Sequence, residues 1–299
     1  MNRKKWGFIV VAIIIILALL GIFLYRQIIT GRQIAGVSVT EPTNIAFIDP
    51  TRPNGTIISE DFFRINASVV ESDLRDIIFN WNNVNYSFYD DSLVLMMNFD
   101  NRSELGENDT YAVDLSKSSN NGSIVNATFN SIGRYGGALE FDESNDSLVV
   151  GTTNWNLNLT ISMWFYAKEF SSGTNANYLF GHTTQPAFAN RIQIYTNDAS
   201  GLLDLGIGNS HTLRTNIIDL DTNKWYYVTL TLNGTNYTLY LNGAQIAVGA
   251  YSGLTALDSF ADIGNNGNPA TRAEAFNGTI DEVRIWNRSL SAEEVMQQY

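Results

Sequence analysis

The sequence lacks cysteine altogether and contains only 2 histidines and 5 prolines. Without cysteine the chain has no disulfide, no thiolate metal site and no cysteine nucleophile. His182 and His211 are therefore the only candidates for a histidine base, and neither lies near a serine in an elbow-like turn. No P-loop or dinucleotide-binding fingerprint occurs in the sequence. These absences argue against nucleotide-dependent enzymes and against enzymes with a cysteine or serine nucleophile.

Positive charge is also scarce, because 18 basic residues stand against 30 acidic ones and the net charge is −12. A surface of this sign repels phosphate backbones, so nucleic acid is not an expected partner. It suits cations and neutral sugars, although solubility alone also explains it. Hydrophobic residues make up 44% of the chain, with 6 Trp, 14 Tyr and 16 Phe. That content is enough to fill a sizeable β core.

A long uncharged apolar run, Trp6 to Tyr25, follows three basic residues at positions 3–5. As a helix, it is long enough to cross the hydrocarbon layer of about 30 Å. We therefore expect residues 1–5 to be a cytoplasmic tail, residues 6–25 to be a single-pass membrane anchor and the rest to be extracellular. A cleaved secretory signal is one alternative, but the run is long for it. A pilin-like leader is another, but Ala12 stands where such leaders usually carry Glu.

The remaining chain divides by composition. Residues 26–44 contain glycine, proline and polar residues typical of a stalk. Residues 45–91 predict a short β module, with a hairpin turn at Asn82-Asn83, that resembles the front half of an immunoglobulin-like domain. Residues 92–299 form a denser series of short strands separated by Asn-Gly and Gly-Gly turns. Many short strands at short spacing indicate a sandwich or a barrel.

The strand that closes this second region is predicted over 279–287, almost at the end of the chain. Because unpaired edges invite aggregation, we expect it to pair with residues 93–99 and 138–141. Regular alternation would place Ile280 on the face opposite Val283 and Ile285. A short helix is expected over residues 291–298, where Ser291 and Glu294 have capping-box spacing.

Several motifs appear together in the second region. They are LVLMMNFD (93–100), DLSKSSNNGS (114–123), GRYGGALEFDESND (133–146), LTISMWFYAK (159–168), KWYYVTLTLNGTNYTLYLNG (224–243) and IDEVRIWNRSLSAEEV (280–295). In this order they resemble the laminin-G-like (LamG-like) jelly roll of the concanavalin A-like lectin and glucanase superfamily. The resemblance implies a mainly β fold over residues 92–299, an antiparallel two-sheet jelly-roll β-sandwich. It also implies binding of a glycan or of a surface protein, although fold alone does not decide function.

Glycoside hydrolysis requires two carboxylates that flank the scissile bond. The glucanases of the resembled superfamily place them on one strand face as Glu-x-Asp-x-x-Glu. Here the nearest string has Glu140 and Asp142, but Asn145 stands at the third acidic position. We therefore expect a protein without catalytic residues.

Calcium is the one cofactor that the resemblance suggests, because many relatives hold a structural Ca²⁺ ion at a sandwich rim. Calcium is bound by six to eight oxygen ligands. If residues 138–141 pair with the last strand, Asp142 and Asp146 approach Asp281, and these three are the candidate ligands. Alternatively, the carboxylates cap turns or accept hydrogen bonds from backbone amides.

Sugar binding would need aromatic platforms beside polar groups. Ser162, Trp164 and Tyr166 share one face of a strand, and Trp164 is expected in the core because the inner face of a central strand is apolar. Three aromatic residues are expected in loops and are candidate ligand contacts: Trp155, Phe188 and Tyr251.

Acceptor sequences for N-glycosylation, Asn-x-Ser/Thr, are more frequent than the roughly 5 expected by chance. They begin at Asn54, Asn66, Asn85, Asn101, Asn108, Asn121, Asn126, Asn145, Asn158, Asn233, Asn236, Asn277 and Asn287. The excess predicts a glycoprotein with a glycan-coated exterior. An Asn- and Thr-rich β protein could also overproduce the motif.

Three functions are consistent with the sequence. The first is a membrane-anchored, non-enzymatic cell-surface protein that binds glycan or a surface partner. The second is a structural envelope component with no specific ligand. The third, a glycoside hydrolase, is disfavoured by the missing third carboxylate.

Overall fold

The computed structural model describes residues 9–15, 45–48, 51–53, 56, 63–69, 75–81, 83–142, 145–170, 176–184, 190–197, 201–268 and 274–299. The chain divides into two compact units. The smaller comprises residues 1–75 and 80–85, and the larger comprises residues 76–79 and 86–299.

The smaller unit contains a three-stranded antiparallel sheet in the order β1-β3-β2. Its strands are β1 (Ile9–Ile15), β2 (Ile45–Ile48) and β3 (Phe63–Val69). Alternate residues of β3, Ile65, Ala67 and Val69, are buried, as the period of the sequence predicts.

Strand β1 lies within the predicted membrane anchor, and it pairs with β3 instead of forming a helix. Among the residues that the structure describes, no helix has the length and apolar character needed to cross a bilayer. The rest of the predicted anchor, the tail (1–5) and the stalk (26–44) lie outside the described residues. Membrane attachment therefore stays a prediction, as does the immunoglobulin-like character of residues 45–91.

Strands β4 (Ile77–Trp81) and β5 (Val84–Tyr89) form a hairpin. Asn83 in its turn has a φ of 66°. Asparagine tolerates this left-handed conformation better than most residues, which accounts for the turn predicted there.

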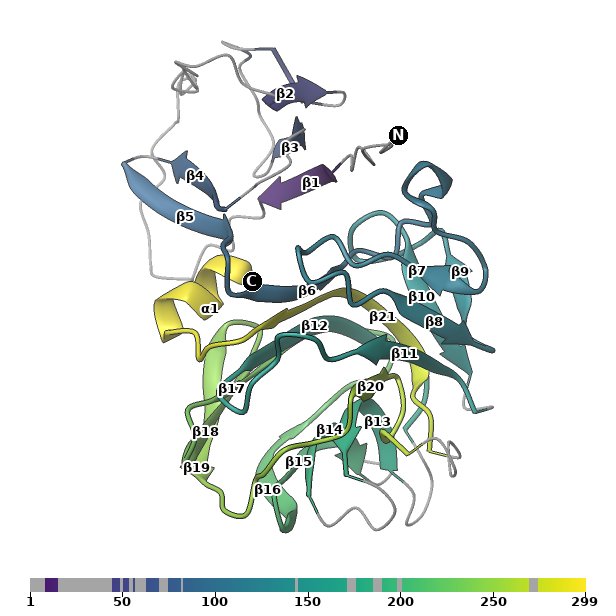
Figure 1. Ribbon diagram of the computed structural model, residues 1–299, viewed down its shortest axis with the longest axis vertical. Coiled ribbons are helices and arrows are strands. Elements are labelled where there is room, and N and C mark those ends of the chain that lie inside the picture. The colour runs from purple at the N-terminus through teal and green to yellow at the C-terminus, as the bar shows by residue number, and fades with distance from the viewer. Residues whose placement is uncertain are drawn as a thin grey trace, which may run out of the picture. The chain divides into compact units, whose positions relative to one another are not determined.

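The larger unit contains two eight-stranded sheets within its described residues (Figure 1). The first, here called the β21 sheet, has the order β19-β18-β17-β12-β21-β10-β9, and β6 also pairs with β21. Its strands are β6 (Leu93–Met97), β9 (Thr128–Asn130), β10 (Ala138–Asp142), β12 (Thr160–Ala167), β17 (Trp225–Leu232), β18 (Asn236–Leu241), β19 (Ala244–Ala250) and β21 (Asn277–Trp286).

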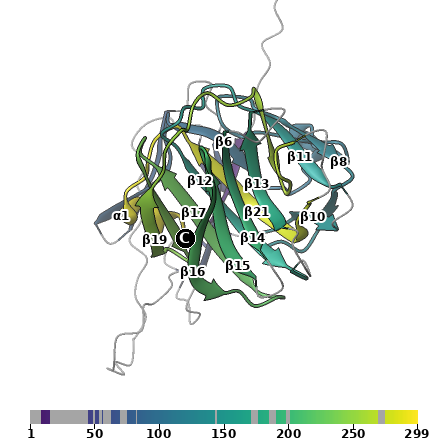
Figure 2. The same cartoon turned by 90° about the horizontal axis from the view of Figure 1, so that it is seen from below.

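The second sheet, here called the β14 sheet, has the order β16-β15-β14-β13-β20-β11-β8-β7, and Figure 2 shows β13 to β16 side by side. Its strands are β7 (Tyr111–Ala112), β8 (Gly122–Val125), β11 (Ser147–Gly151), β13 (Ala176–Thr183), β14 (Arg191–Asn197), β15 (Leu202–Ile207), β16 (Ser210–Asp219) and β20 (Phe260–Ile263). Paired strands in both sheets are antiparallel, as expected for a jelly roll.

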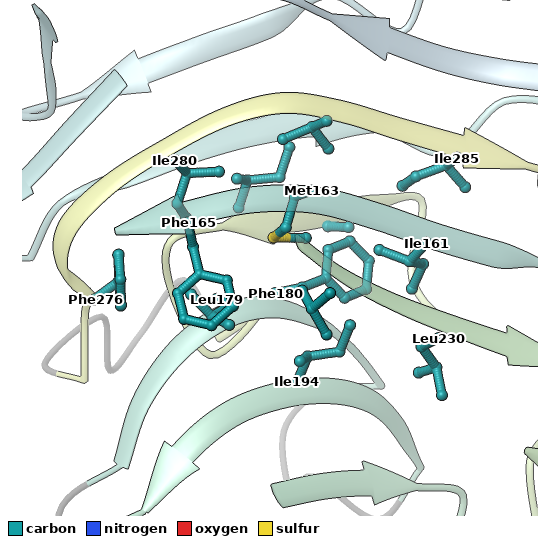
Figure 3. Close-up of a cluster of buried hydrophobic side chains, with 14 of the residues drawn as sticks. Ile161, Met163, Phe165, Leu179, Phe180, Ile194, Leu230, Phe276, Ile280 and Ile285 are labelled. Carbon is teal, nitrogen blue, oxygen red and sulfur yellow. The ribbon is translucent and has the colours of Figure 1, made fainter. Parts of the chain in front are cut away.

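The hydrophobic core lies between the two sheets. Side chains from β12 and β21 point toward those of β13 and β14 (Figure 3). Phe165 and Ile280 from the first sheet and Phe180 and Ile194 from the second are all fully buried. This arrangement confirms the predicted antiparallel β-sandwich.

Strand β21 is central to its sheet and confirms the predicted closure of the fold. On one side it pairs with β12 along nearly its whole length. On the other side its first half pairs with β10, where Leu139 lies opposite Ile280, and its second half pairs with β6, where Ile285 lies opposite Leu95.

A β-bulge interrupts β21 and corrects the predicted alternation. Ser162 of β12 lies opposite Arg284, whereas Trp164 lies opposite Asp281, so Glu282 and Val283 together face one residue of β12. Glu282 has a φ of 51°. The extra residue shifts the phase, and Ile280 therefore faces the core together with Val283 and Ile285.

The chain ends in helix α1 (Ala292–Gln298), as predicted. The Ser291 hydroxyl accepts from the Glu294 backbone N–H at 3.2 Å, and the Glu294 carboxylate accepts from the Ser291 N–H at 2.8 Å. Arg288 joins the helix to the start of β6, because its guanidinium contacts both Glu294 and Asp90. A short 3₁₀ helix, η1, spans Ser103–Leu105.

Candidate functional site

The three predicted calcium ligands do not come together. Asp142 and Asp146 are neighbours, because the Asp142 N–H donates to the Asp146 carboxylate at 2.8 Å. Asp281 does not join them, because Asp142 lies opposite Asn277, four residues or about 13 Å along β21. Among the described residues there is no group of three acidic or histidine side chains that could hold a metal. The predicted trio therefore does not fit a single ion.

Asp281 is instead buried at the bulge. Its carboxylate accepts from the backbone N–H of Tyr135 at 2.9 Å and of Glu282 at 2.7 Å. Burial raises its pKa well above the usual value, and the nearby Glu282 carboxylate adds to the rise. This is the alternative role that the sequence left open, a carboxylate bonded to backbone amides.

The predicted loop platforms are also largely internal. Tyr251 belongs to the core, and its hydroxyl accepts from the Gly234 N–H at 2.9 Å. Trp155 is half-buried against the core and stacks on Phe180 with 6.2 Å between ring centroids. Phe188 lies outside the described residues. Tyr251 is therefore buried, and one face of the Trp155 ring is occupied by Phe180.

The structure describes the surroundings of one of the two histidine candidates, His182. His182 is buried with its ring edge-on to Trp155, and its Nε2–H donates to the Asp258 carbonyl at 2.7 Å. Burial lowers the pKa of His182, so it is neutral at pH 7. His211 lies on β16.

The acceptor asparagines lie mostly at the surface. Those described as exposed are Asn85, Asn101, Asn108, Asn126, Asn145, Asn158, Asn233 and Asn236, and Asn121, Asn277 and Asn287 are half-buried. Asn54 lies outside the described residues, and Asn66 lies on β3. Asn101, Asn126 and Asn145 have positive φ angles. Turn geometry therefore explains part of the asparagine content.

The outer face of the β21 sheet, the face turned away from the core, carries the aromatic cluster that the loops do not supply. Tyr166 of β12 lies directly opposite Trp225 of β17, and Trp164 lies opposite Tyr227. The ring centroids are 5.5 Å apart in the first pair and 5.2 Å apart in the second. The two pairs are two positions apart along each strand, or about 7 Å. The result is a two-by-two aromatic array.

Trp164 is therefore buried, as predicted, but not in the core between the sheets. Its indole is 3% exposed because it is covered on the outer face. The Arg134 guanidinium lies 4.4 Å from the centre of its ring, and the ring of Tyr299 stacks on it at 5.5 Å. The first pair of the array, Tyr166 and Trp225, is only half-buried, and we call it the open pair.

Polar groups continue the row that begins at the open pair. Thr279 of β21 lies opposite Tyr166, and Glu140 of β10 lies opposite Thr279. With Trp225 at one end and Thr128 of β9 at the other, the row crosses five adjacent strands, or about 19 Å. This width, with aromatic rings at one end and polar side chains at the other, is suited to an extended polar ligand.

Glu140 is the charged residue of this row. Its carboxylate binds the Lys168 ammonium and accepts from the Asn130 side-chain amide at 2.8 Å. The bond from Lys168 is the main reason that the pKa of Glu140 lies below its usual value. Glu140 is thus an ionised acceptor at neutral pH, not the protonated carboxyl that a glycosidase needs as general acid.

At the other end of the row, the Tyr166 hydroxyl donates to the Asn223 side chain at 3.3 Å. Asn223 has a φ of 60°, and its N–H donates to the Ala167 carbonyl at 2.7 Å, which fixes the turn before β17. The hydrogen bond to Asn223, which lies in the turn before β17, therefore fixes the open pair in addition to the pairing of β12 with β17. A rigid platform of this kind loses little entropy on binding.

The outer face of the β14 sheet is polar too, but it is buried. Gln193 is 1% exposed and donates to the Asn266 carbonyl at 2.8 Å. The backbone of Asn266 crosses the sheet above Gly181, where a Cβ atom would lie 2.2 Å from the Asn266 carbonyl carbon. At Gln193 and Gly181 this face is therefore closed by its own chain.

Sequence reasoning found part of this site and missed part of it. The shared face of Ser162, Trp164 and Tyr166 was visible from alternation. Trp225 belongs to the motif at 224–243, but only the register shows that it pairs with Tyr166. Lys168 follows β12 directly. A cation at the end of a strand rich in aromatic residues is the sequence signal that could have pointed to this part of the site.

Residues 142–296 match the family model described as the concanavalin A-like lectin/glucanases superfamily. The chain belongs to this superfamily. A search of curated proteins finds no sequence match.

Solved structures share this superfamily fold with low sequence identity. Domain 4 of AbnA, a GH43 extracellular arabinanase from Geobacillus stearothermophilus, in complex with arabinotriose, has a TM-score of 0.54 and 19% identity, and the match covers 69% of this chain and 98% of that one. The binding domain of Paraclostridial Mosquitocidal Protein 1 has a TM-score of 0.52 and 19% identity, covering 69% and 51%. Trypanosoma rangeli sialidase has a TM-score of 0.56 and 15% identity, covering 81% of this chain and 41% of that one. At these identities the likeness shows the fold alone.

Proposed function

We propose that this protein is a non-enzymatic carbohydrate-binding protein that holds glycan on the outer face of its β21 sheet. The open pair Tyr166 and Trp225 is the observation that carries the proposal. Sugar rings have apolar C–H faces that pack on aromatic rings, and their hydroxyl groups need polar partners beside those rings. The row supplies both, because Glu140 and Lys168 follow the aromatic pair across the sheet.

The energies are consistent with modest affinity. An aromatic contact contributes about 0.5–1.5 kcal/mol beyond its area burial. Hydrogen bonds to a charged group such as the Glu140 carboxylate contribute about 1.5–3 kcal/mol each. Two stacked sugar rings and two such bonds, after the cost of association, correspond to dissociation constants from about micromolar to millimolar.

Similar solved structures support a sugar ligand without identifying it. The arabinanase domain is a complex with arabinotriose, and its match spans nearly the whole of that domain. The sialidase is an enzyme, but only 41% of its chain is matched. Binding without turnover fits better here, because Glu140 is held ionised by Lys168 and Asn145 replaces the third carboxylate of the glucanase pattern.

A glycan array with the full chain tests the proposal, with Trp225→Ala as the disabling variant. The matched control is Phe47→Ala, because Phe47 is an exposed aromatic residue of the smaller unit and is 48% exposed. We expect the unaltered chain and Phe47→Ala to bind the same glycans, and Trp225→Ala to lose them. Absence of binding by the unaltered chain, or equal binding by Trp225→Ala, would overturn the proposal.

An extracellular location is part of the proposal, and it rests on the acceptor asparagines and on the uncharged run at residues 6–25. Asn126 is exposed, whereas Asn121 is half-buried and its side-chain oxygen accepts from the Asp114 N–H at 2.9 Å, which holds the side chain against its own chain. We expect peptide mass spectrometry of the native protein to find glycan at Asn126 and none at Asn121. Unmodified peptides throughout would contradict the extracellular assignment.

Calcium is not part of the proposed binding mode, because Asp281 lies apart from Asp142 and Asp146. The sequence prediction of a structural ion is tested by melting the protein with calcium and with chelator. A midpoint that is the same in both conditions removes the prediction.

A further inference from the structure

The closed half of the aromatic array has the same construction as the open half. Trp164 and Tyr227 repeat the cross-strand geometry of Tyr166 and Trp225, about 7 Å further along the same two strands. The difference lies in what covers them. The ring of Tyr299 stacks on Trp164 with an interplanar angle of 28° and on Tyr227 with an angle of 29°.

Tyr299 reaches this position from the end of α1 with few other ties. Its backbone N–H donates to the Val295 carbonyl at 3.3 Å, a long hydrogen bond. Gly243 leaves room for the ring, since a Cβ atom there would lie 3.2 Å from Tyr299 Cδ1. The side chain of Tyr299 is itself half-exposed, so its ring covers the pair while one side faces solvent.

Beside the covered pair lies a set of buried hydroxyl groups without hydrogen-bond partners in the described structure. Ser162, Tyr227 and Thr229 are at most 2% exposed, and none of their hydroxyls makes a hydrogen bond of normal geometry. Ser162 lies opposite Thr229 on the neighbouring strand, and the Tyr227 hydroxyl lies close to both of their hydroxyls. Burying a hydroxyl without a good partner is unfavourable, because its desolvation is not compensated.

A charged pair borders these hydroxyls. The Arg284 guanidinium binds the Glu282 carboxylate at 2.5 Å and donates to Gln298 of α1 at 3.2 Å. Arg284 lies opposite Ser162 on β21. Hydroxyls able to donate and accept and a buried Arg–Glu pair thus lie on the same part of the outer face as the two rings that Tyr299 covers.

We propose that Trp164, Tyr227, Ser162 and Thr229 form a second pyranose subsite, continuous with the open pair, and that the ring of Tyr299 occupies it in place of a sugar. This inference rests on the proposed function, because it extends the same carbohydrate row. Tyr299 fills the stacking position but leaves the hydroxyls unpaired, whereas a neutral sugar ring satisfies both. A sugar chain long enough to extend from the open pair into the second subsite therefore displaces Tyr299.

The consequence is a lowered apparent affinity for longer chains, because only the fraction of molecules with Tyr299 displaced binds at both subsites. Removing the ring should restore that affinity. We expect Tyr299→Ala to bind cellotetraose or maltotetraose about tenfold tighter than the unaltered chain, the equivalent of one stacking contact. Tyr299→Phe, which keeps the ring, should bind like the unaltered chain.

Isothermal titration of these variants with both tetrasaccharides is the test. A gain in Tyr299→Ala that disappears when Thr229→Val is added supports the second subsite. Equal affinities of Tyr299→Ala and Tyr299→Phe, or a gain that survives Thr229→Val, would overturn it. Trp225→Ala separates the two proposals, because it disables the open pair and should leave a residual gain from Tyr299→Ala.

A second measurement covers the case in which Tyr299→Ala does not fold. With 3-fluorotyrosine at position 299 of the otherwise unaltered chain, millimolar tetrasaccharide should shift the fluorine resonance as the ring leaves Trp164. If the protein binds glycan on the array but the fluorine resonance does not move, the proposed function stands and the second subsite is contradicted.

Discussion

Trp164 of β12 lies opposite Asp281 of β21, at the point where a bulge adds one residue to β21. The bulge turns Glu282 into a left-handed conformation and brings two consecutive acidic residues to the outer side of the sheet. Both are buried, and burial raises the pKa of each. The bulge therefore places ionisable groups directly beside the covered half of the aromatic array.

Replacing Asp281 with Asn should flatten the pH dependence of stability. A carboxyl group with a raised folded-state pKa stabilises the protein fully below its unfolded pKa, near 3.8, and this contribution is lost as pH rises toward the folded-state value. The free energy of unfolding of the unaltered protein should thus fall as pH rises above 3.8, by up to about 1.4 kcal/mol per pH unit for this one group.

Urea denaturation from pH 4 to pH 8 measures this slope. In Asp281→Asn a smaller slope should remain, because Glu282 also has a raised pKa. Since Asn retains one acceptor for the two amides, the slope is the informative quantity and not the absolute stability. Parallel pH profiles for the two proteins would show that Asp281 is ionised in the folded state.

Glu140→Gln should weaken glycan binding several-fold without changing the fold. The substitution removes the charge that pairs with Lys168 and turns one acceptor oxygen into a donor. Asp142→Asn is the matched control, because Asp142 is exposed on the same strand, two residues away from the row. Titration with the glycan selected on the array, together with melting curves, checks both variants. Equal affinities would remove Glu140 from the site.

Gly181→Ala should destabilise the protein by about 1–3 kcal/mol through overpacking. Its Cβ atom would lie within 2.4 Å of backbone atoms of Asn266 and Gly267, which cannot rotate away as a side chain could. Gly151→Ala is the control, because the nearest atom to its Cβ is the Asn120 side-chain oxygen at 3.2 Å. Denaturant unfolding should show a clearly larger loss for Gly181→Ala, and similar losses would contradict the close crossing.

Ser291→Ala should reduce stability by about 1 kcal/mol, because it removes the N-cap of α1. Glu293→Gln, in the first turn but outside the capping box, should change stability by less than about 0.5 kcal/mol. Since α1 positions Tyr299, Ser291→Ala should also bring tetrasaccharide affinity closer to that of Tyr299→Ala. A cap variant with unchanged unfolding would contradict a stabilising role for the capping box.

The strand pairing of residues 279–287 could be predicted from the sequence, because alternation and the need to close the sheet both point to it. The register could not. A shift by two or four residues keeps the same side chains in the core, so the apolar pattern does not distinguish Asp142 opposite Asn277 from Asp142 near Asp281. For this reason the three predicted calcium ligands lie apart in the structure.

The bulge was equally inaccessible, because Glu282 adopts a positive φ where no glycine or asparagine marks it. Aromatic residues near turns posed a different problem. Trp155 and Tyr251 lie in loops, as expected, but they pack against the core because burying a large ring is favourable wherever the chain permits it. The open platform is formed instead on strands, where Tyr166 and Trp225 meet only through the β12–β17 register.

The side-chain indole N–H resonance of Trp225 provides the most direct measurement of the central proposal, that glycan binds at the open aromatic pair. The chain has 6 Trp, so an ¹⁵N-labelled sample shows few indole signals, and Trp225→Phe identifies the one of interest. During titration with the array-selected glycan, the Trp225 signal should shift progressively, while that of Trp286, which is buried at the other end of β21, stays fixed. A bound glycan that leaves the Trp225 signal in place would contradict the account.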